Sequence, residues 1–192
     1  MFDPELRTIL NRSLEVPLTK ISRRITPNMA TSFGLLIGLT APAAIFYEFP
    51  IIAVFLFLSN RLIDAFDGAI ARHRGHDSDF GEIFDVASDF IIYALIPISI
   101  AYRYGNENAM LIAAFLIGSY YVNAGIMLSV SRITDPRSRG LIEGFETIIF
   151  YCAMILATKY FNQIASVFAF LVFITAIARL FKLYFHVPKI RE

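Results

Sequence analysis

Six long apolar stretches constrain the fold of this chain more than any other feature of its sequence. They cover roughly residues 30–47, 51–70, 83–102, 110–130, 142–158 and 164–185. Their length matches the run of about 20 apolar residues with which an α-helix crosses the hydrocarbon core of a bilayer. The runs are continuous rather than alternating, which argues against the strands of a membrane barrel. The sequence therefore predicts an all-α integral membrane protein with six transmembrane helices.

The composition agrees with a membrane location and argues against two other classes. Of the 192 residues, 57% are hydrophobic and only 17% are charged, so little chain remains for a soluble domain or a disordered region. The formal net charge of +1 provides no basic field, so we expect no nucleic-acid partner. The single cysteine, Cys152, lies in an apolar run and is expected to serve packing.

The first 25 residues predict an amphipathic helix at the membrane surface. Apolar residues recur every three or four positions from Leu6 to Ile25, and basic residues stand between them. A helix packed on a soluble partner is the alternative interpretation of this pattern. We therefore expect an interfacial helix over 1–25, a six-helix transmembrane domain over 26–186 and a cytoplasmic tail over 187–192.

The distribution of positive charge predicts which side of the membrane holds each loop. Thirteen of the 17 Lys and Arg residues fall in the N-terminal segment, in the loops near 71–82 and 131–141, and at the C-terminus. Only Arg103 and Lys159 fall in the opposite loops. Because cytoplasmic loops carry the excess of Lys and Arg, both termini and any site on these loops are expected on the cytoplasmic side.

Ionisable residues inside apolar spans are rare and mark functional sites, and here they gather where the second stretch ends and the third begins. The residues read Arg61-x-x-Asp64-x-x-Asp67-Gly68-x-x-Ala71-Arg72 and, after eight more, Gly81-x-x-x-Asp85-x-x-x-Asp89. At about 100° per residue, the first two aspartates lie on one helical face. The last two are one turn apart and share a face of the next helix. We therefore expect four carboxylates to face one another at the cytoplasmic end of the bundle.

Such a carboxylate cluster predicts a divalent metal. Four close carboxylates in a partly dry site either take up protons or bind cations. Oxygen ligands without His or Cys favour Mg²⁺ or Mn²⁺ over zinc, and Mg²⁺ commonly shares carboxylate ligands with substrate phosphates. Phosphate chemistry is the leading hypothesis, because Gly68 and Ala71 leave room for a bulky anion and Arg72 can bind it. The alternative is that the acids only pair with nearby cations at a solvated helix end, namely Arg61, Arg72, His73 and Arg74.

The full pattern D-x-x-D-G-x-x-A-R-x8-G-x-x-x-D-x-x-x-D resembles the signature of the CDP-alcohol phosphotransferases, or CDP-alcohol phosphatidyltransferases, which are integral membrane enzymes of phospholipid synthesis. Every signature position is present between Asp64 and Asp89. The six spans, the interfacial helix and the segment Thr26-Pro27-Asn28-x-x-Thr31 are also similar to this family. The resemblance identifies the chain as a small bacterial-type member and implies a homodimer in the inner membrane, with residues 26–186 as the catalytic domain.

The resemblance also implies roles for individual residues. Asp64, Asp67 and Asp85 would bind the metal, while Asp89 would complete the metal site and act as general base toward the acceptor hydroxyl. The CDP pocket would be lined by Asn28, Thr31, Asp64, Gly68, Ala71, Arg72 and Gly81, with Arg72 on the diphosphate. The expected cofactor is Mg²⁺ or Mn²⁺, as two ions. The implied reaction is attack by an alcohol on the lipid-linked phosphorus of CDP-diacylglycerol, which releases CMP.

The alcohol acceptor is not specified by the signature, which describes the shared nucleotide and metal chemistry. Arg132, Arg137 and Arg139 cluster before the fifth stretch and could hold a phosphate on the acceptor. The alternative is that these arginines contact anionic lipid headgroups. Glu143 could contact acceptor hydroxyls or pair with the same arginines. We therefore hypothesise a small polar, phosphorylated alcohol as the acceptor.

Other functions compete with phosphatidyl transfer from CDP-diacylglycerol. Within the same family, the chain could use a CDP-amino-alcohol donor and a diacylglycerol acceptor. A cation transporter would place its intramembrane acids near the bilayer midplane, whereas here they are expected at one end of the bundle. A non-catalytic scaffold leaves the four acids without an evident purpose.

Overall fold

All the regular secondary structure in the described part of the chain is helical. A computed structural model describes residues 26–74, 79–131 and 144–186, and these residues contain no strand. The helices are α2 (Pro27–Phe46), α3 (Pro50–Arg74), α4 (Asp79–Tyr104), α5 (Ala109–Ser131), α6 (Gly144–Leu156), the 3₁₀ turn η1 (Thr158–Tyr160) and α7 (Phe161–His186). The expected interfacial helix over 1–25 and the tail over 187–192 lie outside the described residues. The all-α class predicted from the sequence is confirmed for the part that the structure describes.

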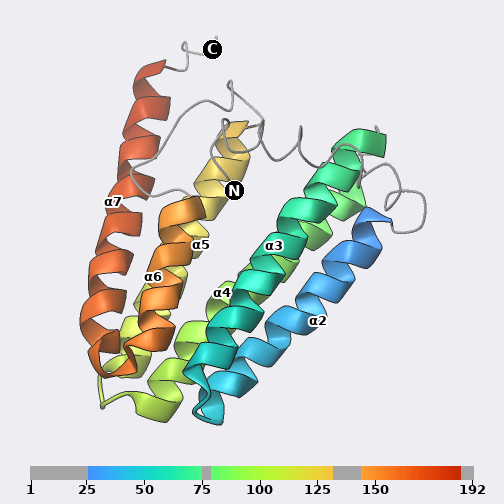
Figure 1. Cartoon of the computed structure of the whole chain (residues 1–192). Helices are drawn as coiled ribbons and strands as arrows, with labels where there is room; N and C mark the ends of the chain where they lie inside the picture. Colours follow the sequence, from blue (N-terminus) through green and yellow to red (C-terminus); the bar gives the residue numbers. More distant parts are fainter. Residues whose placement is uncertain (1–25, 75–78, 132–143, 187–192) are drawn as a thin grey trace.

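The helices form one bundle in which chain-adjacent helices run in opposite directions. Figure 1 shows α2 and α3 side by side at one edge and α5, α6 and α7 at the other, with α4 running between the two groups. The start of α2, the end of α3 and the start of α4 lie at the same end of the bundle as the ends of α5 and α7 (Figure 1). This arrangement brings the signature residues, which are distributed over two helices, to one end of the molecule.

The surface of the bundle is apolar, as expected for a protein in lipid. Among the described residues, four helical segments are long and apolar enough to cross a membrane: Pro27–Phe46, Phe80–Tyr104, Ala109–Ser129 and Thr158–Phe181. Large apolar side chains point outward along these and the other helices, among them Phe33, Phe55, Leu111 and Phe170. In water this much exposed apolar surface would drive association, whereas in a bilayer it faces acyl chains. The protein is an integral membrane protein. That α3 and α6 also cross the membrane stays a prediction.

The helix boundaries differ by a few residues from the apolar stretches that predicted them, for example in α3 and α6. The second stretch ends near residue 70, yet α3 continues to Arg74, because the polar turn that follows the apolar run remains helical. The fifth stretch was expected over 142–158, whereas α6 is described over Gly144–Leu156 and a 3₁₀ turn follows it. Hydropathy reports which residues prefer lipid, and the backbone hydrogen bonds decide where a helix stops.

Small residues on α2 let this helix approach α3 and α4 closely. Ala30, Gly34, Gly38 and Ala41 recur at helical spacing and are buried. A Cβ atom added at Gly38 would stand 2.6 Å from Cδ1 of Ile92 and 3.0 Å from the Cγ atom of Asn60. The three helices can therefore enclose a narrow cleft between them, and the functional site lies in this cleft.

An aromatic core packs α3 and α4 against α6 and α7 beside that cleft. Phe57, Tyr93, Tyr151 and Phe168 are buried, and successive ring centroids lie 4.8 to 6.1 Å apart. The Tyr151 hydroxyl donates a hydrogen bond to the backbone oxygen of Tyr93 over 2.6 Å. Packed rings of this kind move little, since each fills the space between several neighbours. The core therefore provides a rigid wall beside the site.

Candidate active site

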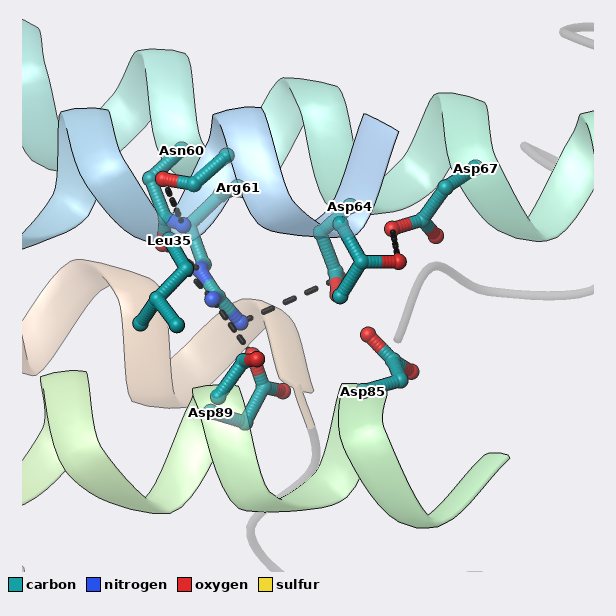
Figure 2. A pocket seen from close by; sticks show the side chains of 10 residues that line it. Leu35, Asn60, Arg61, Asp64, Asp67, Asp85 and Asp89 are labelled. Atoms are coloured by element: carbon teal, nitrogen blue, oxygen red, sulfur yellow. Dashed lines mark hydrogen bonds and ion pairs between the residues drawn. The ribbon is translucent and has the colours of Figure 1, made fainter. Parts of the chain in front are cut away.

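Three carboxylates converge in the cleft between α2, α3 and α4. Asp64 and Asp67 come from α3, and Asp85 comes from the start of α4. One carboxylate oxygen of each lies within 4.8 Å of the others, and Figure 2 shows the three side chains facing one another. Two helices that meet at one end of the bundle thus create a compact cluster of negative charge.

The surroundings of this cluster suit a divalent cation. The Thr31 hydroxyl on α2 donates a 2.7 Å hydrogen bond to Oδ2 of Asp67, which orients that carboxylate. Oδ1 of Asp85 is buried and makes no hydrogen bond with any residue that the structure describes. Buried carboxylate oxygens without a donor are costly unless a cation or a proton satisfies them. A set of oxygen ligands alone favours Mg²⁺ or Mn²⁺, so the residues present fit the expected metal.

The fourth signature carboxylate lies beside a guanidinium. Oδ1 of Asp89 accepts a hydrogen bond from Nη2 of Arg61 over 2.5 Å, and the same arginine lies 3.8 Å from Oδ2 of Asp64. Figure 2 shows Asp89 beside Arg61, with Asp85 and Asp67 further along the cleft. The four aspartates line one cleft, as the sequence predicted. Within it, three gather as a possible metal cluster and the fourth pairs with Arg61.

Several residues of the cleft were assigned no role by sequence reasoning. Its lining also includes Gly34, Leu35, Asn60 and Ser88. Asn60 is the most polar of these four, and in the sequence it interrupts an apolar run directly before Arg61. Isolated polar residues within a span mark internal contacts, so the sequence could have predicted that Asn60 and Arg61 line the site.

The residues expected to bind CDP occupy the same end of the bundle, to the extent that they are described. Asn28 and Thr31 lie in the first turns of α2, while Gly68 belongs to α3 and Gly81 to α4. Thr31 contacts the acid cluster directly through Asp67. The backbones of two further candidates, Ala71 and Arg72, belong to α3, and their side chains lie outside the described part of the structure. The possible acceptor residues also lie outside the described residues, namely Arg132, Arg137, Arg139 and Glu143.

The fold and the site together define a helical membrane protein with a carboxylate cluster suited to a divalent cation at one end of its bundle. The sequence profile of the CDP-alcohol phosphatidyltransferase family matches residues 24–182. The chain belongs to this family. It is therefore a transferase of phospholipid biosynthesis, and the resemblance noted from the signature is confirmed.

Individual relatives cover nearly the whole chain. It is 29% identical to the inner membrane protein YnjF of Escherichia coli, over 94% of this chain and 92% of that protein. It is 30% identical to the archaetidylinositol phosphate synthase of Pyrococcus horikoshii, over 89% of this chain and 90% of the relative.

Solved structures share the fold. The phosphatidylinositol phosphate synthase of Mycobacterium tuberculosis with CDP-DAG bound superposes with a TM-score of 0.75, covering 98% of both chains at 18% identity. The same enzyme in complex with manganese and citrate gives a TM-score of 0.73 at 18% identity, over 97% of this chain and 92% of the other. At this identity the likeness establishes the fold of the chain alone.

Proposed function

We propose that the chain transfers a phosphatidyl group from CDP-diacylglycerol to the hydroxyl of a small polar alcohol and releases CMP. The observation that carries this proposal is the convergence of Asp64, Asp67 and Asp85 to within 4.8 Å in a cleft at one end of the bundle. A site at the end of a membrane bundle suits a substrate with a wet nucleotide and lipid-soluble acyl chains. The relative that was solved with CDP-DAG bound has the same fold.

The three clustered aspartates would hold the divalent metal, with Asp89 at the edge of the set, and two ions are our proposal for the loaded site. When bound, Mg²⁺ or Mn²⁺ would neutralise charge on the diphosphate and so reduce its repulsion toward a nucleophile. The protein's own contribution is to orient these carboxylates. Thr31 holds Asp67, and the close packing of α2 on α3 sets the width of the cleft. Gly68, Ala71, Arg72, Gly81 and Asn28 would contact CDP.

Asp89 is the proposed general base. The acceptor oxygen forms a new bond to the lipid-linked phosphorus, the bond from that phosphorus to the CMP oxygen breaks, and CMP leaves with the electron pair. The proton of the acceptor hydroxyl passes to Asp89. Since Oδ1 of Asp89 accepts a hydrogen bond from Arg61, its second oxygen is the one available to take this proton. A positioned carboxylate of this kind contributes about 10²- to 10⁴-fold in rate.

The acceptor that we propose is a phosphorylated polyol. Two archaeal relatives, from Pyrococcus horikoshii and Aeropyrum pernix, are archaetidylinositol phosphate synthases, and their product carries a phosphorylated polyol headgroup. The cluster of Arg132, Arg137 and Arg139 supplies planar donors suited to a phosphate. Glu143 would contact the acceptor hydroxyls. We also propose that the protein is a homodimer, as the family implies, and that the site lies on the cytoplasmic side of the membrane.

Release of CMP tests the reaction. Purified protein in lipid nanodiscs would be given CDP-diacylglycerol, Mn²⁺ and inositol phosphate, and both CMP and the lipid product would be measured. We expect CMP and a new phospholipid in equal amounts. Turnover of a CDP-amino-alcohol with diacylglycerol would instead support the alternative transferase. Metal-dependent cation flux without CMP release would contradict the proposal.

The acceptor is tested by comparing phosphorylated with unphosphorylated polyol. We expect Arg132→Ala and Arg139→Ala to raise the KM for the phosphorylated acceptor and to leave CDP-diacylglycerol binding almost unchanged. Arg103→Ala is the control, because Arg103 pairs with Glu48 at the opposite end of the bundle. Efficient use of the unphosphorylated polyol by wild type, with no change of KM in either variant, would instead assign these arginines to lipid headgroups.

A further inference from the structure

We propose that Arg61 is a positioning residue for Asp89: it holds one oxygen of this carboxylate so that the other is directed to the reacting hydroxyl. The inference rests on the proposed phosphatidyl transfer and adds a residue outside the signature to its machinery. Arg61 lies three residues before the first signature aspartate, on the same helix.

The guanidinium of Arg61 is held in one orientation by several hydrogen bonds. Nη2 donates to Oδ1 of Asp89 over 2.5 Å. Nε and Nη2 donate to Oδ1 of Asn60 over 2.9 and 2.7 Å, and Nη1 donates to the Tyr93 hydroxyl over 3.3 Å. The side chain is only 6% exposed. A planar group with donors fixed on three partners has little freedom to rotate, so it presents Nη2 to Asp89 in a defined direction.

The partners of Arg61 are themselves fixed to the framework of the bundle. Nδ2 of Asn60 donates to the backbone oxygen of Gly34 on α2 over 2.9 Å. The guanidinium carbon lies 4.9 Å from the ring centroid of Tyr93, and Tyr151 on α6 donates to the backbone oxygen of Tyr93. The orientation of Arg61 is therefore set by four helices. Such a network supports a reactive group more precisely than a single exposed ion pair does.

The geometry of α4 explains why Asp89 needs such a partner. Asp85 and Asp89 are four residues apart and lie on the same face of this helix, so both carboxylates can reach the metal cluster. The structure nevertheless separates them, with Asp85 in the three-carboxylate cluster and Asp89 on Arg61. Arg61 thus occupies one oxygen of Asp89, so that this carboxylate has its other oxygen left for the acceptor hydroxyl.

A stabilising role accounts less well for this pair. Arg61 is buried and Asp89 is partly buried, and taking such charges out of water costs free energy that their attraction does not reliably return. An alternative role is direct binding of a substrate phosphate. That role predicts a change in substrate affinity, whereas positioning of a base predicts a change in turnover, so the two are separable by kinetics.

The first test compares Arg61→Gln with wild type for kcat, for the KM of CDP-diacylglycerol and for Mn²⁺ affinity. We expect kcat to fall by about 10²-fold, within the range of a general base, with KM and Mn²⁺ affinity changed less than about threefold. Arg103→Gln is the matched control, because it removes an arginine from the pair with Glu48 at the far end of the bundle, and it should behave as wild type. Equal losses in KM and kcat for Arg61→Gln would overturn the inference in favour of phosphate binding.

The second test asks whether Arg61 acts through Asp89. In an Asp89→Asn background, we expect Arg61→Gln to lower kcat by less than about threefold further, because residues that act as one unit are not additive. A full additional loss of about 10²-fold would overturn the inference. If Arg61→Gln does not fold, Tyr93→Phe removes only the hydroxyl that accepts from Nη1. Its kcat should fall and this loss should disappear in the Asp89→Asn background, whereas an unchanged kcat would overturn the inference.

These outcomes are distinct from failure of the proposed function. If wild type releases no CMP from CDP-diacylglycerol, the transfer reaction is wrong. If wild type turns over and Arg61→Gln matches it in kcat, the reaction stands and the positioning role of Arg61 is wrong.

Discussion

Replacement of Thr31 by valine tests whether the hydroxyl on α2 organises the metal cluster. Thr31 is buried, and valine keeps its branched shape while a methyl group replaces the hydroxyl. The threonine hydroxyl has one proton and two nearby acceptors, Oδ2 of Asp67 at 2.7 Å and the backbone oxygen of Pro27 at 3.1 Å. The shorter contact to the charged oxygen is the stronger one. The substitution therefore removes chiefly the support of Asp67.

The expected magnitude follows from that one hydrogen bond. A hydrogen bond to a charged group contributes about 1.5–3 kcal/mol, and each 1.4 kcal/mol corresponds to about tenfold in affinity. Partners that orient metal ligands typically change metal affinity by about 10- to 100-fold. We therefore expect Thr31→Val to weaken Mn²⁺ binding by about 10-fold or more. Turnover at limiting metal should fall with it and recover in part at high Mn²⁺.

Mn²⁺ titration of purified protein in nanodiscs, followed by electron paramagnetic resonance, measures the affinity directly. Ser32→Ala is the matched control, because the Ser32 hydroxyl is exposed and donates to the backbone oxygen of Asn28 within its own helix. This variant should bind Mn²⁺ as wild type does. If Thr31→Val also binds Mn²⁺ with wild-type affinity, the hydroxyl does not support a metal ligand and the role assigned to Thr31 is wrong.

Three further predictions concern packing, metal and topology. Gly38→Ala should destabilise the bundle by about 1–3 kcal/mol through overpacking, since its Cβ would lie 2.6 Å from Cδ1 of Ile92. Gly118→Ala is the control, because a Cβ atom at Gly118 would have no neighbour within 4 Å among the described residues, and this variant should unfold at the wild-type temperature or above. Chelation of divalent metal should abolish CMP release, and Asp85→Asn should lose metal-dependent nucleotide binding. Full turnover after verified metal removal would contradict the metal dependence. A cysteine placed at Glu192 should resist impermeant labels in intact cells, and its labelling would reverse the proposed orientation.

Much of the fold could be predicted because its main determinants are local. Apolar runs of helical length appear directly in the sequence, and all of them contain helices in the described residues. The same is true of the signature, whose spacing puts Asp64 and Asp67 on one face and Asp85 and Asp89 on another. Helical periodicity is a property of the backbone, so these placements need no knowledge of the tertiary structure. The family followed from the same spacing.

The sequence by itself therefore determined the helical class, the membrane environment and the set of carboxylates at one end of the bundle. Only the tertiary structure decided how that set divides, with Asp85 joining the cluster on α3 and Asp89 pairing with Arg61. It also decided that Thr31 contacts Asp67, although the two are 36 residues apart. Periodicity places a side chain on a face of its own helix. The rotation and approach of neighbouring helices, set here by the small residues of α2 and the aromatic core, determine which side chains on facing helices meet.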